Sequence, residues 1–307
     1  MVNETVSSNH ELDRLEQSSI QSTRPKSIHT SKYQQPDVII IGAGFSGLSL
    51  AYYLLKAGLT VEIFEKSHRC GGLIDTIDTE FGPVETAANS FILTPKSQQF
   101  LRELNLEPLL ADKKSRKRFI FRNRPKVWPL TFSETLSSIP YIVSFLRRYL
   151  FTRVSLLANE TESLYVWAER NLGSALAEHL VTPAIQGIYI LDAKELNASL
   201  IVNPILLKKK TPGDQYLGIC SFQGGMKTLI HSLETRIRAL GGVIHLNTAW
   251  NSQTAEARGL HSIEQNPWIV CCTSARDAIE VLETPTLKNR GVSQHLIDRL
   301  KSVRSLS

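Results

Sequence analysis

Residues 38–65 read VIIIGAGFSGLSLAYYLLKAGLTVEIFE, and this stretch decides the fold of the 307-residue chain. Its first four residues, Val38–Ile41, form an apolar run short enough to be a buried parallel strand. The spacing of apolar residues predicts a helix over Leu48–Ala57, and Gly58 follows where a helix stop is expected. A second strand is expected over Val61–Phe64. The stretch therefore predicts a strand–helix–strand unit.

Three glycines at the turn of this unit predict a ligand. Gly42, Gly44 and Gly47 give the pattern G-x-G-x-x-G. The first allows a tight turn, the second lets the backbone approach a diphosphate, and the third lets the helix pack against the sheet. Glu65 follows after roughly 20 residues, where an acid meets ribose hydroxyls. Because a helix N-terminus attracts anions, a dinucleotide is a better interpretation than a purely structural turn.

The residues that follow Glu65 distinguish FAD from NAD. Residues 66–76 read KSHRCGGLIDT, and they resemble the fingerprint R-x-G-G-x-x-x-T of the FAD-dependent amine oxidase and protoporphyrinogen oxidase superfamily. Paired glycines let the main chain run against the cofactor, and Arg69 can face phosphate or ribose oxygens. The competing interpretation is a glycine turn before a β-hairpin.

Two more segments carry the resemblance. Residues 81–91 are similar to the family's E-x-G-P-N-S-F segment near the flavin ring, with alanines in place of Gly and Pro. Residues 221–248 are similar to its glycine–helix–strand return to the FAD domain, and the resemblance implies that Trp250 meets the adenine through its backbone. The cofactor-binding residues implied for FAD are Gly42, Ala43, Gly44, Phe45, Ser46, Gly47, Glu65, Lys66, Arg69, Gly72, Asn89, Ser90 and Trp250.

A substrate residue is implied in the region between these segments. Residues 113–126 contain eight basic residues and no acid, and most of them are expected on a solvated hairpin face. Arg118 begins the run R-F-I-F, which resembles a family strand whose arginine pairs with a tetrapyrrole propionate. Arginine and carboxylate form bidentate hydrogen bonds, so Arg118 is the substrate-binding candidate.

The rest of the inserted region is expected to be mostly helical. Residues 132–153 form an apolar and basic segment that Pro140 breaks or kinks. An amphipathic helix packed on the core and an apolar surface resting on a membrane are equally supported by the residues, and the resemblance favours the membrane. Residues 162–173 predict a helix ended by glycine, and residues 183–192 resemble the family's P-x-x-x-G-V-Y-x-x-D.

Composition excludes several other classes of protein. Hydrophobic residues make up 42% of the chain and charged residues 21%, and the net charge of +6 without a basic face does not indicate nucleic-acid binding. The four cysteines lack C-x-x-C or metal-ligand spacing, which fits reduced thiols in the cytoplasm. There is no apolar run of 18 residues and no secretory signal, so a cytoplasmic protein, peripheral on a membrane at most, is expected.

The expected fold is α/β: a Rossmann-like FAD-binding domain with an inserted, mostly helical lobe for substrate or membrane. The expected parts are a disordered tail (1–35), the first part of the FAD-binding domain (36–95), the inserted lobe (96–213), and the return with the start of an incomplete substrate sheet (214–307). The C-terminal third of the family architecture is expected to be absent, so the chain is interpreted as a fragment, a split gene product or a degenerate homologue.

The function implied by the resemblance is an FAD-dependent oxidoreductase of the protoporphyrinogen oxidase type. It would take hydride from a porphyrinogen to the flavin, with oxygen as acceptor, in porphyrin and heme biosynthesis. The catalytic residues and the oligomeric state stay unassigned. The alternatives are another amine oxidase or desaturase on this scaffold, or a non-catalytic remnant of the FAD fold.

Overall fold

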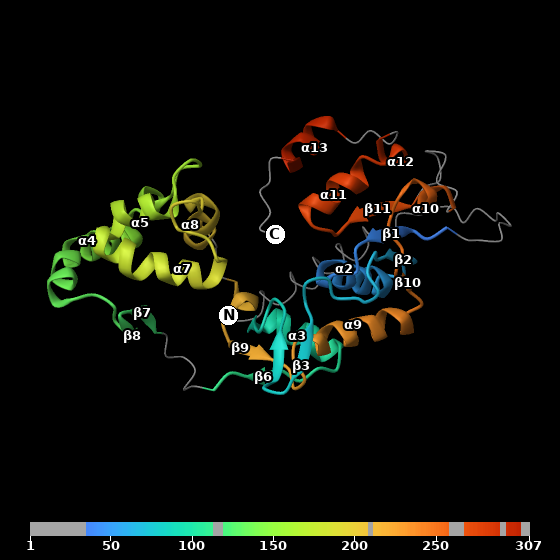
Figure 1. Ribbon diagram of the computed structural model, residues 1–307, viewed down its shortest axis with the longest axis horizontal. Helices are drawn as coiled ribbons and strands as arrows, with labels where there is room; N and C mark the ends of the chain where they lie inside the picture. Colours follow the sequence, from blue (N-terminus) through green and yellow to red (C-terminus); the bar gives the residue numbers. More distant parts are fainter. Residues whose placement is uncertain (1–34, 113–118, 208–210, 258–266, 289–292, 302–307) are drawn as a thin grey trace, which may run out of the picture.

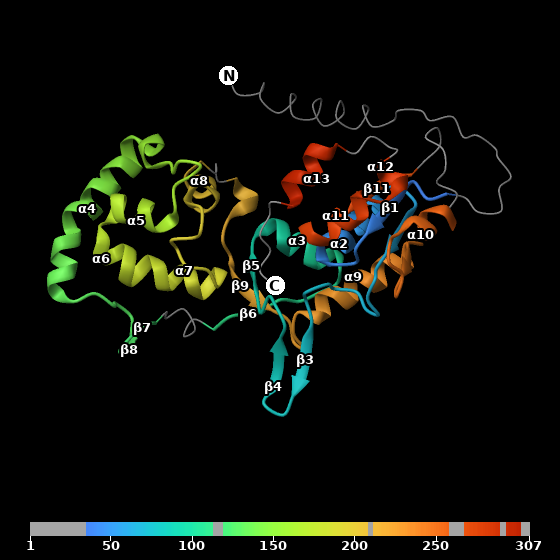
Figure 2. The same ribbon diagram turned by 45° about the horizontal axis from the view of Figure 1, so that its top comes forward.

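The chain forms two bodies in a computed structural model that describes residues 35–112, 119–207, 211–257, 267–288 and 293–301. The first body, which we name the dinucleotide-binding domain after the glycine motif in its sequence, comprises the described residues of 35–112 and 211–301; the second, the helical lobe, comprises residues 119–207. Figure 1 shows the lobe to one side of the domain, and Figure 2 shows the same separation from another angle.

A four-stranded parallel sheet forms the centre of the dinucleotide-binding domain. Its strands are β1 (Val38–Ile41), β2 (Val61–Phe64), β10 (Val243–His245) and β11 (Trp268–Cys271), in the order β10-β2-β1-β11. The register places Val38 opposite both Val61 and Trp268. All four residues of β1 are buried because helices cover both faces of the sheet, which confirms the strand expected from the apolar run.

Alternate residues of β1 pack into two different cores. Val38 and Ile40 share a core with α2 (Phe45–Lys56) and α9 (Lys227–Ala239). Ile39 and Ile41 share the other with α10 (Ser252–Ala257), α11 (Ala275–Leu282) and α12 (Pro285–Lys288). The last helix, α13 (Gln294–Lys301), packs against α11. The Ser274 hydroxyl accepts a hydrogen bond from the Asp277 N–H, so Ser274 caps the N-terminus of α11.

Antiparallel strands connect this domain to the lobe. The strands β3 (Thr76–Thr79) and β4 (Gly82–Glu85) form a hairpin, which projects from the domain in Figure 2. A three-stranded sheet has the order β5-β9-β6, with β5 (Phe91–Leu93), β6 (Leu109–Leu110) and β9 (Gly218–Ser221). The strand β6 precedes the lobe in the sequence, and η4 (Pro212–Asp214) and β9 follow it. Because β6 and β9 are neighbours in the sheet, the chain leaves the domain and returns to it at the same sheet.

Helix α3 (Pro95–Glu103) lies in the dinucleotide-binding domain, although the sequence places this segment at the start of the inserted lobe. Phe100 contacts the rings of Phe45, Tyr52 and Tyr53 on α2. Glu103 forms a 2.8 Å ion pair with Lys56. Leu101 of α3 is buried in the core that contains residues of α2 and α9, so this helix packs with the parallel sheet's helices.

A polar clamp joins the hairpin to α9. The Glu85 carboxylate accepts hydrogen bonds from the Met226 N–H (2.9 Å) and the Thr76 hydroxyl (2.8 Å). The Thr76 hydroxyl oxygen also accepts from the Lys227 N–H at 3.0 Å. These bonds satisfy backbone donors at the start of α9 that the helix leaves unpaired. Gly225 lies under the clamp, with a φ of +81°.

The helical lobe has a core of its own. It begins with the hairpin β7 (Ile120–Arg122) and β8 (Arg124–Lys126), and its helical segments are α4 (Phe132–Phe151), η2 (Arg153–Leu156), α5 (Leu164–Leu172), α6 (Ser174–Leu176), η3 (Ala177–Val181), α7 (Thr182–Tyr189) and α8 (Ala198–Leu207). The Trp167 indole N–H donates to the Leu156 carbonyl oxygen (2.7 Å) inside this core. Its buried residues are all from the lobe, so the lobe packs around itself.

Pro140 is expected to break or kink residues 132–153, and α4 continues through it, so the break does not occur. Proline lacks the N–H that would bond the carbonyl of Leu136, but Pro140 is exposed and water can take the place of that donor. Among the described residues, no helix combines the length and the apolar character needed to cross a bilayer.

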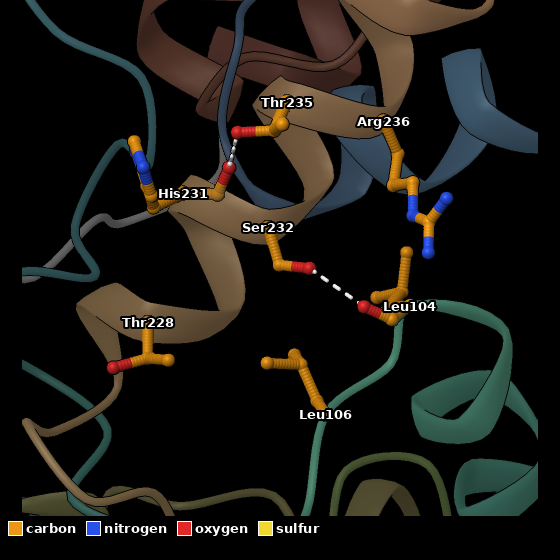
Figure 3. A pocket seen from close by; sticks show the side chains of 7 residues that line it. All are labelled: Leu104, Leu106, Thr228, His231, Ser232, Thr235 and Arg236. Atoms are coloured by element: carbon orange, nitrogen blue, oxygen red, sulfur yellow. Dashed lines mark hydrogen bonds between the residues drawn. The ribbon is translucent and has the colours of Figure 1, made fainter.

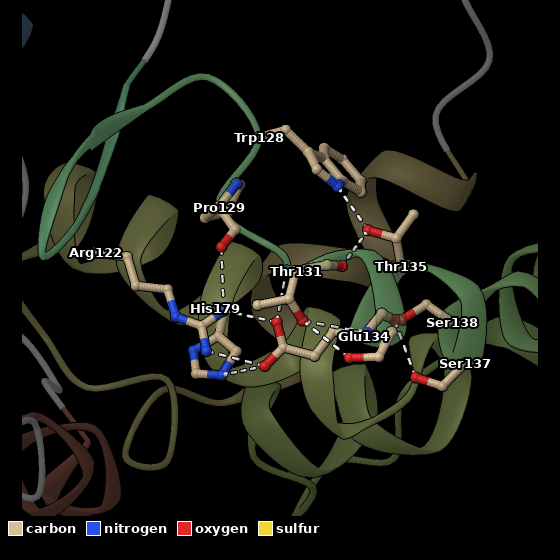
Figure 4. Close-up of polar contacts among 10 residues, drawn as sticks. Arg122, Trp128, Pro129, Thr131, Glu134, Thr135, Ser137, Ser138 and His179 are labelled. Carbon is tan, nitrogen blue, oxygen red and sulfur yellow. Dashed lines mark hydrogen bonds and ion pairs between the residues drawn. The ribbon is translucent and has the colours of Figure 1, made fainter.

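An arginine–glutamate pair attaches the β7–β8 hairpin to the first turn of α4 (Figure 4). The two terminal nitrogens of Arg122 donate to the two Glu134 oxygens at 2.7 and 2.9 Å. Glu134 also accepts from the Thr131 N–H at 2.8 Å, which completes the capping box of α4. The His179 ring nitrogen lies 3.6 Å from the same carboxylate.

Replacing Gly225 tests the clamp. In Gly225→Ala the new methyl carbon would lie 2.4 Å from the Thr76 hydroxyl oxygen and 2.5 Å from a Glu85 oxygen. Gly241→Ala is the matched control, because φ is +87° there and no heavy atom lies within 4 Å. Both variants should lose about 1 kcal/mol from the positive φ, and Gly225→Ala should lose about 2 kcal/mol more from crowding. Urea denaturation measures both losses, and equal losses would contradict the clamp.

Acid should weaken the Arg122–Glu134 attachment. Arg122 holds the pKa of Glu134 well below its ordinary value of 4.5. A depressed carboxyl pKa stabilises the fold above the unfolded-state pKa, and this contribution is lost as pH falls through the folded-state pKa. Glu134→Gln should therefore lower the thermal midpoint at pH 7, and the gap from the wild type should narrow below pH 4.5. A gap that is constant with pH would exclude this role.

Candidate functional site

The glycine turn after β1 leaves an open position at its second glycine. A Cβ on Gly47 would lie 2.0 Å from the Gly42 carbonyl oxygen, and one on Gly42 would lie 2.8 Å from the Cys272 carbonyl oxygen. Gly42 and Gly47 are therefore required by close backbone packing. A Cβ on Gly44 would meet no heavy atom within 4 Å. Gly44 thus borders space that a ligand can enter.

The N-terminus of α2 opens onto the same space. Gly44 is its N-cap, and no side chain caps the helix. The first N–H groups of a helix have no acceptor within it, and together they carry a partial positive charge. Phe45 and Ser46, the first two helical residues, are exposed. This arrangement can bind an anion such as a diphosphate.

Glu65 joins this turn to the loop after β2. It is 8% exposed. One of its oxygens accepts from the Ala43 N–H at 2.8 Å. The other accepts from the N–H and the hydroxyl of Ser67, at 2.9 and 2.6 Å. A carboxylate has about four acceptor positions, so Glu65 can hold the loop and still accept a ribose hydroxyl.

The second glycine pair lies against the first turn. The Gly71 N–H donates to the Ala43 carbonyl oxygen at 2.8 Å, and Gly44 and Gly71 form a parallel β-bridge. A Cβ on Gly72 would lie 3.3 Å from the Gly44 Cα. The loop therefore forms a second wall beside the open position at Gly44.

Arg69 shapes this loop from within. Its terminal nitrogens donate to the carbonyl oxygens of Cys70, Gly72 and Ile74 at 3.0 to 3.1 Å. Its Nε lies 3.3 Å from an Asp75 oxygen. Binding of a cofactor oxygen by Arg69 stays a prediction, since these bonds give the side chain a structural role.

The remaining residues with an expected cofactor role are spread around the ends of the strands. Lys66 forms a 2.7 Å ion pair with Asp277 on α11, which raises the pKa of Lys66 and lowers that of Asp277. Trp250 is buried against Phe64, with 5.2 Å between ring centroids. Its indole N–H has no hydrogen-bond partner among the described residues.

Asn89 and Ser90 lie apart from this group. The Ser90 hydroxyl donates to the Asn89 side-chain oxygen at 3.0 Å just before β5, and Asn89 is exposed. The described hydrogen bonds do not join either residue to the glycine turn. Their expected place near the flavin ring stays a prediction.

The substrate candidate Arg118 lies outside the described residues. Arg122, four residues later, is committed to Glu134. Sequence reasoning missed this pair and also the clamp formed by Thr76 and Glu85. Thr76 lies within a recognised fingerprint and Glu134 lies three residues after Thr131, as in a capping box, but neither pattern reveals the distant partner.

A hollow of ≈ 420 Å³ lies beside α9, and it is lined by residues of that helix together with Leu104 and Leu106 (Figure 3). Two of its hydroxyl groups donate to backbone carbonyls: Ser232 to Leu104 at 3.0 Å and Thr235 to His231 at 2.8 Å. None of the residues with an expected cofactor role is among the described residues that line it. The residues that fit a dinucleotide are those at Gly44, the start of α2, Glu65 and Gly72, where an uncapped helix end faces open space.

Comparisons with known proteins agree with this geometry. Residues 45–259 match the family model described as flavin containing amine oxidoreductase. The chain is 27% identical over 235 residues to protoporphyrinogen oxidase 2 of Arabidopsis thaliana, covering 64% of this chain and 46% of that protein. It is 39% identical over 75 residues to the thiamine thiazole synthase of Saccharolobus solfataricus, 24% of this chain and 26% of that protein.

Solved structures share the fold. An oxidoreductase from Methanosarcina mazei superposes with a TM-score of 0.58 at 19% identity, covering 87% of this chain and 65% of that one. A Pyrococcus furiosus protein superposes with a TM-score of 0.59 at 15% identity, with the same coverage. Against the curated relative from Arabidopsis thaliana, in contrast, the match spans about half of that protein's length. The family match covers most of the chain, including α2, the second glycine pair, the lobe and α9, so the protein belongs to the flavin containing amine oxidoreductase family.

Proposed function

We propose that this chain binds FAD at the glycine turn and serves an oxidoreductase of the protoporphyrinogen oxidase type. The observation that carries the proposal is the open position at Gly44 beside the uncapped N-terminus of α2, with the buried carboxylate of Glu65 next to it. These features suit the diphosphate and the ribose of a dinucleotide. Membership of a flavin family favours FAD over NAD.

The chain's residues would bind and position the cofactor. The first N–H groups of α2 would take the diphosphate, Glu65 the ribose hydroxyls, and the second glycine pair would close the other side. When bound, FAD would supply the hydride acceptor. The clamp between Glu85, Thr76 and the start of α9 would keep these walls in place, because it joins segments far apart in the sequence.

The substrate proposal rests on the similarity to the Arabidopsis protoporphyrinogen oxidase over 64% of this chain. A porphyrinogen carries propionates, and Arg118 would pair with one of them through two parallel hydrogen bonds. An amine oxidase or desaturase activity is the enzymatic alternative, since the matching family is broader than one substrate.

A non-catalytic flavin-fold protein is a second candidate. It is favoured by the exposed apolar side chains of the β3–β4 hairpin, of which Phe81 is 92% exposed. Residues 81–91, which the family resemblance implies near the flavin ring, begin in this hairpin, and apolar side chains that face water would not shield that ring from solvent. Anaerobic mixing with protoporphyrinogen separates the candidates: bleaching of the flavin band supports the enzyme, and an unchanged band supports the second candidate.

Filling the open position should abolish cofactor binding without unfolding the protein. In Gly44→Val the side chain meets no protein atom near its Cβ, and φ is −68°, so the fold should be kept. The side chain would occupy the diphosphate position, and FAD affinity measured by calorimetry should fall at least about tenfold. Gly187→Val, which also lies in open space, should bind FAD as the wild type does. Unaltered affinity in Gly44→Val would refute the proposed site.

Removing the Arg118 guanidinium should affect substrate and spare the cofactor. Losing a charge-assisted hydrogen-bond pair of about 1.5–3 kcal/mol should reduce kcat/KM for protoporphyrinogen by about tenfold or more in Arg118→Ala. Flavin content, read from the visible absorbance, should not change. Arg124→Ala, which changes an exposed arginine of the β7–β8 hairpin, is the control and should keep wild-type kinetics. Identical kinetics in the two variants would remove Arg118 from the site.

A further inference from the structure

Helix α4 carries a row of exposed apolar side chains along one side. Within the row the exposed fraction runs from 46% to 86%. Successive members are 4, 3, 4, 3 and 4 residues apart. We call this row the α4 seam; its members are Phe132, Leu136, Ile139, Val143, Leu146 and Leu150.

The spacing is that of a coiled coil. Alternating steps of three and four residues give a repeat of 3.5, which produces a narrow seam rather than a broad apolar face. The opposite side of α4 already packs on the lobe: Phe145 contacts the Trp167 ring and Ser138 is buried. The α4 seam is therefore a second apolar side, additional to the one that the lobe uses.

The position of α4 leaves the seam accessible. Figures 1 and 2 both show α4 at the outer end of the lobe, away from the dinucleotide-binding domain. The helix has 20 residues, so it is about 30 Å long at 1.5 Å per residue. A helix of this length offers nearly three heptads to a partner.

The seam matches itself when reversed. Read from either end, the steps are the same, so two antiparallel copies related by a two-fold axis near Tyr141 place every seam residue opposite another. Phe132 would meet Leu150, and Leu136 would meet Leu146. Ile139 would meet Val143 across the centre. Each layer pairs the two alternating seam positions, as in antiparallel coiled coils.

Charge favours the same orientation. Arg147 is exposed beside the seam, and it is close to one end of the helix. Parallel pairing would bring the two Arg147 side chains together, whereas antiparallel pairing separates them towards opposite ends. In antiparallel pairing Arg147 lies across from Thr135, which is uncharged.

We propose that the α4 seam binds a second copy of this chain, helix against helix in antiparallel register. A lipid surface suits the seam less well, because interfacial helices present a wide apolar face flanked by many basic residues. Here Ser133 and Ser137 are exposed outside the seam, where Tyr141 and Phe151 are the exposed apolar side chains, and the basic residues of α4 are confined to its last turns. One helix pair is small against the roughly 800 Å² per partner of a standard interface, so the dimer dissociates on dilution.

Sedimentation velocity of the full chain over a wide concentration range tests this. The wild type should shift from monomer to dimer. Leu136→Glu should raise the dissociation constant about a hundredfold or more, because two buried leucines are lost per dimer. Leu200→Glu on α8, also an exposed apolar position, is the control and should dimerise normally. Both leucines are exposed in the monomer, so the fold is retained and circular dichroism verifies it.

A charge-pair rescue tests the register. In the double variant Leu136→Glu/Leu146→Lys, the glutamate of each copy lies opposite the lysine of the other copy. The two ion pairs should recover much of the lost affinity. Adding Leu146→Glu instead should not. Rescue that fails, or a wild type that is monomeric at every concentration, overturns the proposal. Binding of the monomer to phosphatidylglycerol vesicles, abolished by Leu136→Glu, would identify a membrane as the occupant and overturn it as well.

Discussion

The close approach of α2 to the end of β1 fixes the geometry on which the candidate site depends. At Gly47 the helix lies so near the Gly42 carbonyl that a side chain has no room. This contact directs the first N–H groups of the helix towards the space beside Gly44. The buried carboxylate of Glu65 then bonds the Ala43 N–H and ties the loop after β2 to the same turn. A helix end, an acid and two glycine turns thereby converge on one place.

Segments from the other end of the chain hold this arrangement together. Strands β10 and β11 flank the βαβ unit in the parallel sheet, and α9 packs on α2. The clamp at Thr76 and Glu85 then links the hairpin to the start of α9. The local sequence forms the glycine turn, but the segments around it are held in place by contacts between distant residues, such as Thr76 and Lys227. A substitution in the second half of the chain can therefore disturb the candidate cofactor site, although the residues of that site lie in the first half.

The helical lobe is organised differently, because it has its own core and its own polar attachment. Arg122 and Glu134 join a hairpin to a helix within the lobe, and Trp167 bonds across the lobe core. The lobe connects to the domain through two neighbouring strands, β6 and β9. It can therefore present surfaces of its own, including the α4 seam, without altering the glycine turn after β1.

The sequence by itself determined the βαβ unit, the glycine turn and the acid at Glu65, because these depend on spacing along one continuous stretch. It also indicated the α/β class and the helical insertion. Only the tertiary structure decided that Arg69 bonds its own loop, that α3 packs on α2, and that α4 runs through Pro140. The partners of Glu85 and Arg122 were equally hidden. A repeat pattern shows which residues share a face, but contact between distant segments depends on how the chain folds back.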